Sequence, residues 1–254
     1  MSAGDDGAFD AGLVDVLARA EDDSFWFRSR NELIISTLGR AFPGASTFLE
    51  VGCGTGFVLR GLHLARPDLV LTGAELSADG LKVARERLPD VRLLELDVLA
   101  MPFEEAFDVV GAFDVIEHVE DDARALAGLL QAVRPGGGVL LTVPQHRWLW
   151  SAFDEVAGHH RRYSRDGLFA KLERAGFVDI RLTSFVTLLL PAMLASRLRY
   201  PAGSKEFDLE RSLRLPPLAE RICEIAMRVE RRLIEARVRL PAGGSLLAAA
   251  RRPT

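Results

Sequence analysis

The stretch Thr47 to Gly56, which reads TFLEVGCGTG, decides the fold of this chain. A short apolar strand is followed by glycines at alternate positions, Gly52, Gly54 and Gly56. Parallel-sheet proteins use such a strand-to-helix turn to bring bare backbone close to a ligand that carries a nucleoside. The dinucleotide fingerprint G-x-G-x-x-G does not fit, because the third glycine comes one residue early and Phe57 occupies its place. The spacing of the glycines therefore predicts a site that binds a nucleoside. It argues against an NAD-dependent oxidoreductase, the alternative enzyme class that a glycine-rich turn of this kind suggests.

An acid completes the pattern. With Glu50 two residues before the first glycine, E-x-G-x-G-x-G resembles motif I of the class I S-adenosylmethionine (SAM) dependent methyltransferases. The resemblance implies SAM as the cofactor and an α/β fold: a doubly wound, seven-stranded, mostly parallel sheet with an antiparallel last strand. SAM carries no phosphate, so the loop, which includes Cys53, needs only to let the ligand approach its backbone. Glu50 is then expected to serve the ammonium group of the methionine part.

Charged residues are distributed unevenly along the 254 residues. The formal net charge is −4, but residues 197–254 hold 13 basic and 7 acidic side chains, whereas residues 1–196 hold 19 and 29. A basic C-terminal segment therefore follows an acidic body. The length suits one large α/β domain with an insertion, which we favour over two small domains. The main body lacks a basic, aromatic groove, so we expect no nucleic-acid partner.

Cysteine content and apolar runs predict the compartment. The two cysteines, at positions 53 and 223, can build neither a disulfide framework nor a zinc site by themselves. Residues 1–17 are acidic and lack a basic region followed by an apolar core, so they do not resemble a secretory signal. The longest apolar stretch, residues 185–195, contains a proline and is shorter than the roughly 20 residues that span a bilayer. We expect a soluble, cytoplasmic protein.

Apolar runs alternate with helical patterns from residue 47 to residue 185, which is the rhythm of a doubly wound sheet. Helices are expected to begin near residues 56, 78, 121 and 164. Before the first strand, residues 11–38 are predicted to be helical, with a break around the aromatic stretch SFWFRSRN. The predicted strands span residues 47–51, 70–76, 91–97, 107–115, 138–144 and 177–185.

The C-terminal residues 244–252, GSLLAAARR, follow a Pro-Ala-Gly-Gly turn. Their alanines would suit a helix equally well. Class I methyltransferases, however, insert an antiparallel seventh strand between strands five and six, so the resemblance favours a strand. Four segments follow: an N-terminal helical cap over the cofactor (1–46), a SAM-binding Rossmann-like core (47–186), a helical insertion or lid (187–243) and a final edge strand (244–254).

The resemblance implies further cofactor ligands at strand ends. Glu75 ends the second predicted strand, 23 residues after the first glycine, where nucleoside folds place an acid on the ribose hydroxyls. Asp97 ends the third, where this family directs a polar side chain to the adenine amino group, and Leu76 and Val98 would bracket the ring. Arg30 is a candidate partner for the methionine carboxylate. Alternatively, its helix docks by aromatic side chains and leaves the arginines in solvent.

Residues 111–122, GAFDVIEHVEDD, resemble the region after strand four of small-molecule methyltransferases that include the ubiquinone O-methyltransferases. The resemblance implies that Phe113 lines the methionine end of the pocket and that His118 lies at the mouth of the strand. Asp114, Glu117 and His118 also form D-x-x-E-H, similar to the acidic metal-binding pattern proposed for that family. Because acids are favoured near the N-terminus of a helix, Glu117, Asp121 and Asp122 have a simpler explanation, and we predict no metal.

Residues 144–177 resemble bacterial methyltransferases of the type-11 and type-23 domain groups, in which D-E-x-x-G-H-x-R-R-Y-S links strand five to the next helix. The histidines and aromatic residues gathered here can wall an acceptor pocket. A hydroxyl acceptor would need a base, and imidazole titrates near neutral pH, so His118 is the first candidate and His159 the second. An amine, thiol or activated carbon acceptor would need none.

Within the insertion, aliphatic residues recur at three- and four-residue steps between Leu218 and Ala236, and arginines lie elsewhere on the same helix. Such a basic, amphipathic helix fits packing on the domain, and also a peripheral contact with a membrane. The apolar residues 185–198 before it favour a hydrophobic or isoprenoid small-molecule acceptor. The sequence thus predicts methyl transfer from SAM to such an acceptor by in-line displacement. A SAM-binding protein without turnover is the alternative, and the oligomeric state stays open.

Overall fold

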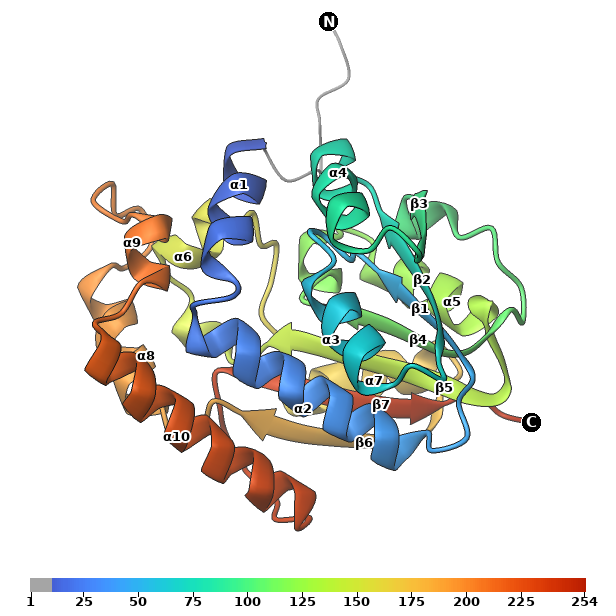
Figure 1. The fold of residues 1–254 in the computed structure, drawn as a ribbon. Helices are drawn as coiled ribbons and strands as arrows, with labels where there is room; N and C mark the ends of the chain where they lie inside the picture. Colours follow the sequence, from blue (N-terminus) through green and yellow to red (C-terminus); the bar gives the residue numbers. More distant parts are fainter. Residues whose placement is uncertain (1–10) are drawn as a thin grey trace, which may run out of the picture.

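A computed structural model describes residues 11–254, and expectations that concern residues 1–10 lie outside this part of the chain. Within it, seven strands form one sheet in the order β3-β2-β1-β4-β5-β7-β6 (Figure 1). β7 is antiparallel to both its neighbours, and the other neighbouring strands are parallel. The predicted fold class is confirmed. The strands are β1 (Thr47–Val51), β2 (Val70–Glu75), β3 (Arg92–Glu95), β4 (Phe107–Phe113), β5 (Val133–Pro144), β6 (Val178–Phe185) and β7 (Ser245–Arg251).

Helices cover both faces of this sheet (Figure 1). α2 and α3 share an apolar cluster with one face, and α5 and α7 share a second cluster with the other. The segment between β6 and β7 is helical, as expected. The α-helices are α1 (Ala11–Ala20), α2 (Phe25–Ala41), α3 (Phe57–Ala65), α4 (Ala78–Arg87), α5 (Asp122–Ala132), α6 (Ala152–Val156), α7 (Arg165–Arg174), α8 (Leu190–Arg199), α9 (Leu209–Leu213) and α10 (Pro217–Glu235). In the described part of the chain, three short 3-10 helices are η1 (Val98–Ala100), η2 (Ile116–His118) and η3 (Arg147–Leu149).

The alternation of side chains along each strand divides the core in two. On β4, Val109 and Phe113 pack in the cluster beneath α2, whereas Val110 packs in the cluster beneath α5. On β1, Phe48 belongs to the α2 side. Residues two apart on a strand point to the same face, so Glu50 also projects toward α2. A carboxyl group is thereby placed on a covered face of the sheet.

The N-terminal helical segment breaks earlier than the sequence suggests. The break covers residues 21–24, and the aromatic stretch forms the first turn of α2 instead of interrupting it. Packing explains the difference, because Trp26 stacks on Phe185 of β6 with 5.8 Å between ring centroids. This contact holds the start of α2 against the sheet.

The prediction of a final edge strand is wrong in one respect. β7 lies between β5 and β6, and the edges of the sheet are β3 and β6. All residues of β7 except its last are buried. Because both sides of the strand find hydrogen-bonding partners, burial in the sheet outweighs the helix propensity of its alanines.

The helical insertion docks on the N-terminal helix α2. The backbone N–H of Phe25, at the start of α2, donates to Glu220 Oε2 near the start of α10 at 2.7 Å. Ser36 Oγ donates to Glu235 Oε1, near the ends of both helices, at 2.6 Å. The two helices therefore run side by side in the same direction (Figure 1). In residues 11–254, no helix combines the length and the hydropathy needed to cross a bilayer.

Asp108 fixes the start of β1 against β4. Its Oδ2 accepts hydrogen bonds from the backbone N–H groups of Ser46 and Thr47, each at 2.9 Å, and its Oδ1 pairs with Arg134 at 3.0 Å. Burial alone would raise the pKa of the Asp108 carboxyl, but these hydrogen bonds hold that pKa well below its usual range. Ionised Asp108 therefore stabilises the folded chain.

We expect Asp108→Asn to lower the free energy of unfolding at pH 7 by about 1.5–3 kcal/mol, because charge-assisted hydrogen bonds are lost. The folded-state pKa lies below the unfolded value of about 3.9, so this stabilisation is present above that value and is lost as the pH falls through the folded pKa. Urea unfolding at pH 7 and at pH 3 measures the difference. Exposed Asp90→Asn is the control. An Asp108→Asn cost that is identical at both pH values would contradict the assignment.

Candidate functional site

The predicted cofactor ligands meet at one edge of the sheet. β1 is parallel to β2 and β4, and Val51, its last residue, pairs with Ala74 and Ala112 near the ends of those strands. β3 is parallel to β2, and Glu75 pairs with Glu95. The carboxyl ends of four strands are therefore adjacent, which is where open α/β sheets bind ligands.

The glycine loop after β1 has a backbone that only glycine adopts easily. Gly52, Gly54 and Gly56 have φ angles of 68°, 52° and 77°. A Cβ on Gly52 would also lie 2.5 Å from Val115 Cγ2, whereas a Cβ on Gly54 would meet no protein atom within 4 Å. The loop is thus packed at its start and has open space beside its middle glycine.

Glu75 ties the glycine loop to the end of β2. Its Oε2 accepts the backbone N–H of Gly54 at 2.8 Å, and its Oε1 accepts the backbone N–H of Ser77 at 2.9 Å. The side chain is 6% exposed. Sequence reasoning gave this residue a ribose role and missed its role in holding the loop, which no local pattern signals.

Glu50 is buried, 2% exposed, and its Oε2 has no hydrogen-bond partner. Burial raises the pKa of this carboxyl well above its usual range, and the nearby Arg30 opposes the shift. Arg30 itself pairs with Asp114 at the end of β4, and its buried Nε has no partner. Its guanidinium lies 5.8 Å from the ring of Phe27. Arg30 therefore neutralises an acid, and its predicted contact with a carboxylate of the cofactor stays a prediction.

The remaining predicted cofactor residues differ in exposure. Asp97 is exposed, and its Oδ1 accepts the backbone N–H of Leu99 at 2.8 Å, which starts η1. Leu76, directly after β2, is 39% exposed, whereas Val98, the first residue of η1, is 8% exposed and belongs to the apolar cluster beneath α5. Phe113 and Cys53 are each 5% exposed and lie in the apolar cluster beneath α2. Phe113 is thus primarily a core residue in this structure.

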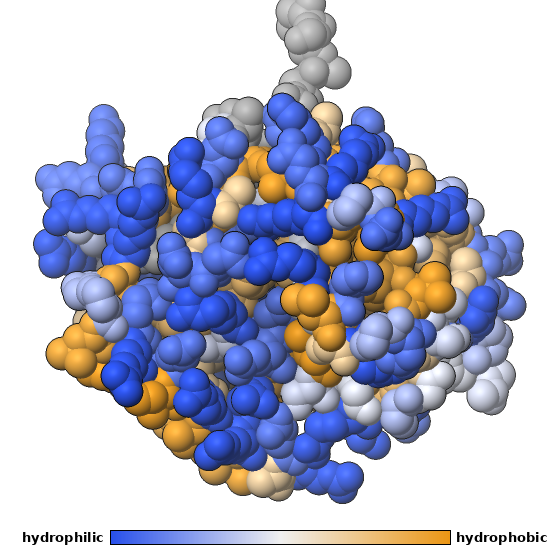
Figure 2. Space-filling model, viewed as in Figure 1, coloured by the Kyte–Doolittle hydropathy of each residue, from blue (hydrophilic) through white to orange (hydrophobic). Residues whose placement is uncertain are grey.

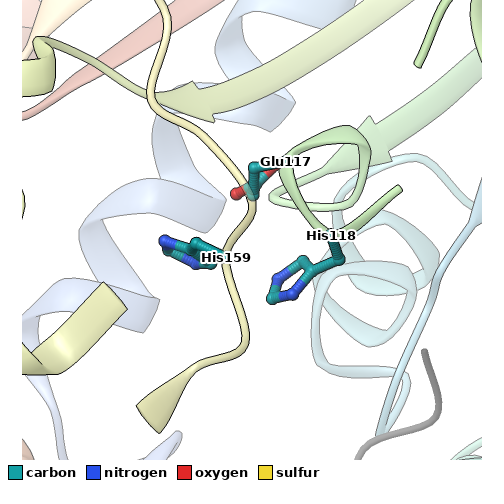
Figure 3. A group of neighbouring side chains, drawn as sticks. All are labelled: Glu117, His118 and His159. Atoms are coloured by element: carbon teal, nitrogen blue, oxygen red, sulfur yellow. The ribbon is translucent and has the colours of Figure 1, made fainter. Parts of the chain in front are cut away.

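The two predicted bases meet beyond the end of β4. The rings of His118 and His159 have centroids 4.8 Å apart at an interplanar angle of 75°. Figure 3 shows these rings converging with Glu117, from the turn after β4 and from the segment after α6. Burial, with a smaller effect of His159, lowers the pKa of His118 to about 4. His118 is therefore a neutral imidazole at neutral pH.

The carboxylate of Asp154 contacts the ring of His159. This fully buried carboxylate lies 2.9 Å from His159 Nδ1 through its Oδ1, which also accepts from Arg162 Nε at 2.6 Å. The backbone N–H of Ser151 donates to its Oδ2 at 3.0 Å. Burial alone would raise the pKa of Asp154, but the hydrogen bond from His159 and the charge of Arg162 lower it. The D-E-x-x-G-H spacing was the signal that could have found this Asp154–His159 pair.

Glu117 completes a possible ligand set for a metal ion. It is 0% exposed, and neither of its carboxyl oxygens has a hydrogen-bond partner. Burial, followed by the neighbouring Asp114, raises its pKa well above the usual range. One ligating atom each from Glu117, His118 and His159 lies within 4.8 Å of the others. A carboxylate and two imidazoles suit a divalent transition metal. Our expectation of no metal stays a prediction, which chelation tests.

Comparisons with known proteins show which proteins this chain is similar to. Residues 49–141 match the model of a family described as a methyltransferase domain. A probable S-adenosylmethionine-dependent methyltransferase of Mycolicibacterium smegmatis is 32% identical over 161 residues, which cover 61% of this chain and 60% of that protein. A ubiquinone biosynthesis O-methyltransferase of Hydrogenovibrio crunogenus is 33% identical over 102 residues, which cover 38% of this chain and 42% of that protein. The chain thus spans less than two thirds of both curated relatives.

A solved structure shares the fold. Phosphoethanolamine N-methyltransferase 2 of Haemonchus contortus, in complex with phosphomonomethylethanolamine and S-adenosylhomocysteine, superposes with a TM-score of 0.65 at 22% identity. The match covers 96% of this chain and 58% of that one. The family match itself begins within β1 and ends within β5, so it includes the glycine loop and the ends of β2, β3 and β4. Over residues 49–141 the chain therefore matches the methyltransferase-domain family, and SAM-dependent methyltransferases are among the proteins that it is similar to.

Proposed function

We propose that the protein transfers a methyl group from SAM to a hydroxyl group of a small, hydrophobic acceptor by in-line displacement. The observation that carries this proposal is the pair of imidazoles, His118 and His159, backed by Asp154 beyond the end of β4. When bound, SAM supplies a sulfonium methyl group that is already electrophilic. The protein then needs to align the acceptor, exclude water and remove one proton.

The cofactor contacts are assigned by the chemistry of each side chain. Each oxygen of Glu75 already accepts one backbone N–H, and a carboxylate oxygen can accept a second hydrogen bond, so we assign the ribose hydroxyls to it. The buried, unpartnered oxygen of Glu50 favours a cation, so we assign the ammonium group to it. Asp97, with Leu76 and Val98, is assigned to the adenine.

The imidazole pair handles the proton. The acceptor oxygen forms a bond to the methyl carbon while the carbon–sulfur bond breaks and its electron pair stays on sulfur. His118, neutral at neutral pH, takes the hydroxyl proton. The carboxylate of Asp154, 2.9 Å from His159 Nδ1, stabilises positive charge on the pair.

Aromatic side chains of the insertion support a hydrophobic acceptor. Phe153 of α6 lies 6.1 Å from the ring of His159, and Phe207 lies 6.2 Å from Phe153 between ring centroids. Tyr200 contacts Phe207 in turn, at 5.7 Å. The segment between α8 and α9 therefore packs over the helix beside the imidazole pair. An apolar wall next to a proton acceptor fits a phenol-like or isoprenoid molecule better than a highly charged one.

The test of this function is turnover. The purified chain is incubated with SAM and prenylated catechols. The same catechols without the prenyl group serve as the matched control acceptors. We expect S-adenosylhomocysteine and a methylated, prenylated catechol to form. Mass spectrometry detects both products. Saturable SAM binding without methylation of any acceptor would instead favour the alternative of a SAM-binding protein without turnover.

For the cofactor site, we expect Glu75→Gln to weaken S-adenosylhomocysteine binding about 10- to 100-fold, because charge-assisted hydrogen bonds to the loop and to the ribose are lost. Titration calorimetry measures the dissociation constant. Glu86→Gln, an exposed change on α4, is the matched control and should bind as the unaltered chain does. If the Glu75→Gln variant bound S-adenosylhomocysteine as tightly as the unaltered chain, the assignment of Glu75 to the ribose would be wrong.

For the proton acceptor, we expect His118→Gln and His159→Gln each to lower kcat on a hydroxyl acceptor by about 10²–10⁴-fold, the range typical of a lost general base. Affinity for S-adenosylhomocysteine should stay unchanged, because the glycine loop is intact. Initial rates with the prenylated catechol measure the effect, and exposed His63→Gln on α3 is the control. Wild-type rates in both variants would exclude a role for the pair.

For the metal prediction, we expect dialysis against EDTA to leave the rate of methyl transfer unchanged, because the imidazole pair supplies the base without an ion. The rate is compared before and after dialysis with the same acceptor, and a mock dialysis is the control. Loss of activity that returns on addition of Zn²⁺ or Mg²⁺ would show that Glu117, His118 and His159 hold a metal.

A further inference from the structure

One face of α10 leaves a row of large aliphatic side chains uncovered. Leu218, Ile222, Ile225 and Val229 are 72%, 57%, 49% and 44% exposed. Their spacing of four, three and four residues places them within an arc of about 60° on a helix with 3.6 residues per turn. Figure 2 shows the corresponding apolar band along the outer edge of the molecule, over α10 in the view of Figure 1. A contiguous exposed row of this kind marks a contact surface, unlike scattered single residues.

Basic and acidic side chains lie on different sides of α10. The exposed charged residues are Arg221, Arg228 and Arg232, which follow the aliphatic row along one flank. All of α10 is described by the structure, and none of its carboxylates is exposed. Each carboxylate bonds to another part of the chain instead: Glu220 to Phe25 N, Glu224 to Arg28, Glu230 to Thr187 N and Glu235 to Ser36.

The side chains of this face indicate what kind of surface binds to it. Aliphatic side chains beside arginines, without acids, match the acyl boundary and the phosphate groups of an anionic lipid surface. A second copy of the same face would bring no carboxylate to pair with the arginines. The charge of the whole chain agrees, since residues 197–254 are basic and the remainder is acidic. That distribution would orient α10 toward a negatively charged surface.

We propose that this face of α10, formed by Leu218, Ile222, Ile225 and Val229 with the three flanking arginines, lies on the surface of anionic bilayers. The helix rests parallel to the membrane, with its aliphatic row at the acyl boundary and its arginines at the lipid phosphates. The proposal goes beyond the proposed function, because lipid binding by this face requires neither SAM nor an acceptor.

The position of the insertion adds a consequence that does rest on the proposed function. Arg197 of α8 donates to Ser151 Oγ at 3.0 Å and lies 4.4 Å from the ring of Phe153, beside the imidazole pair. The segment that ends in α10 therefore also contacts the acceptor end of the site.

The test is co-sedimentation of the full chain with vesicles of phosphatidylcholine mixed with phosphatidylglycerol, and with vesicles of phosphatidylcholine alone. We expect binding to the mixed vesicles that weakens as salt is raised, and little binding to phosphatidylcholine. The double variant Ile222→Ser/Ile225→Ser and the triple variant Arg221→Gln/Arg228→Gln/Arg232→Gln should each bind at least about tenfold more weakly. Both should keep their affinity for S-adenosylhomocysteine, which shows that they fold.

Matched controls carry the same chemical changes elsewhere. Leu64→Ser alters an aliphatic residue that is 74% exposed on α3, and Arg85→Gln/Arg92→Gln/Arg124→Gln removes three exposed arginines from the body. The controls should bind vesicles as the unaltered chain does. Absence of binding to mixed vesicles, equal binding to both vesicle types, or unchanged binding by the α10 variants would overturn the proposal. A dimer in light scattering that Ile222→Ser/Ile225→Ser converts to a monomer would assign the face to a second copy instead.

Discussion

The hydrogen bond from the backbone of Gly54 to the carboxylate of Glu75 is the interaction on which the candidate site depends. A loop with three glycines at positive φ has many alternative conformations, and little in the loop itself selects one. Glu75 supplies that selection from β2, together with the Ala74 carbonyl, which accepts the N–H groups of Gly52 and Cys53 at 2.7 and 3.0 Å. The residue that holds the conformation of the loop, Glu75, is therefore also the residue assigned to the ribose.

Buried polar groups lie on the face of the sheet that α2 covers. Glu50 is held beneath α2 with an oxygen that no protein group satisfies, while Arg30 on α2 is occupied by Asp114. A buried polar atom without a partner costs free energy, which a ligand with the complementary group can recover. Beyond the end of β4, the buried carboxylate of Asp154 lies 2.9 Å from His159 Nδ1 and also accepts a hydrogen bond from Arg162.

Much of the fold follows from local patterns, and the site follows from them in part. The strand of residues 47–51 and the glycine loop were predictable because a short apolar run and the spacing of glycines are properties of neighbouring residues. The contact of Glu220 with Phe25 and the support of His159 by Asp154 were not predicted. The first joins residues 195 positions apart, and the second depends on how one loop folds back. The break before α2 was misplaced for the same reason, since Trp26 packs on the distant Phe185.

The central claim is that the glycine loop at the head of β1 binds an adenosyl compound. Titration of the purified chain with S-adenosylhomocysteine by calorimetry tests it most directly, because binding needs neither an acceptor nor turnover. The account predicts a saturable isotherm with one molecule bound per chain. Absence of any binding heat and of any thermal stabilisation at millimolar concentration would contradict it.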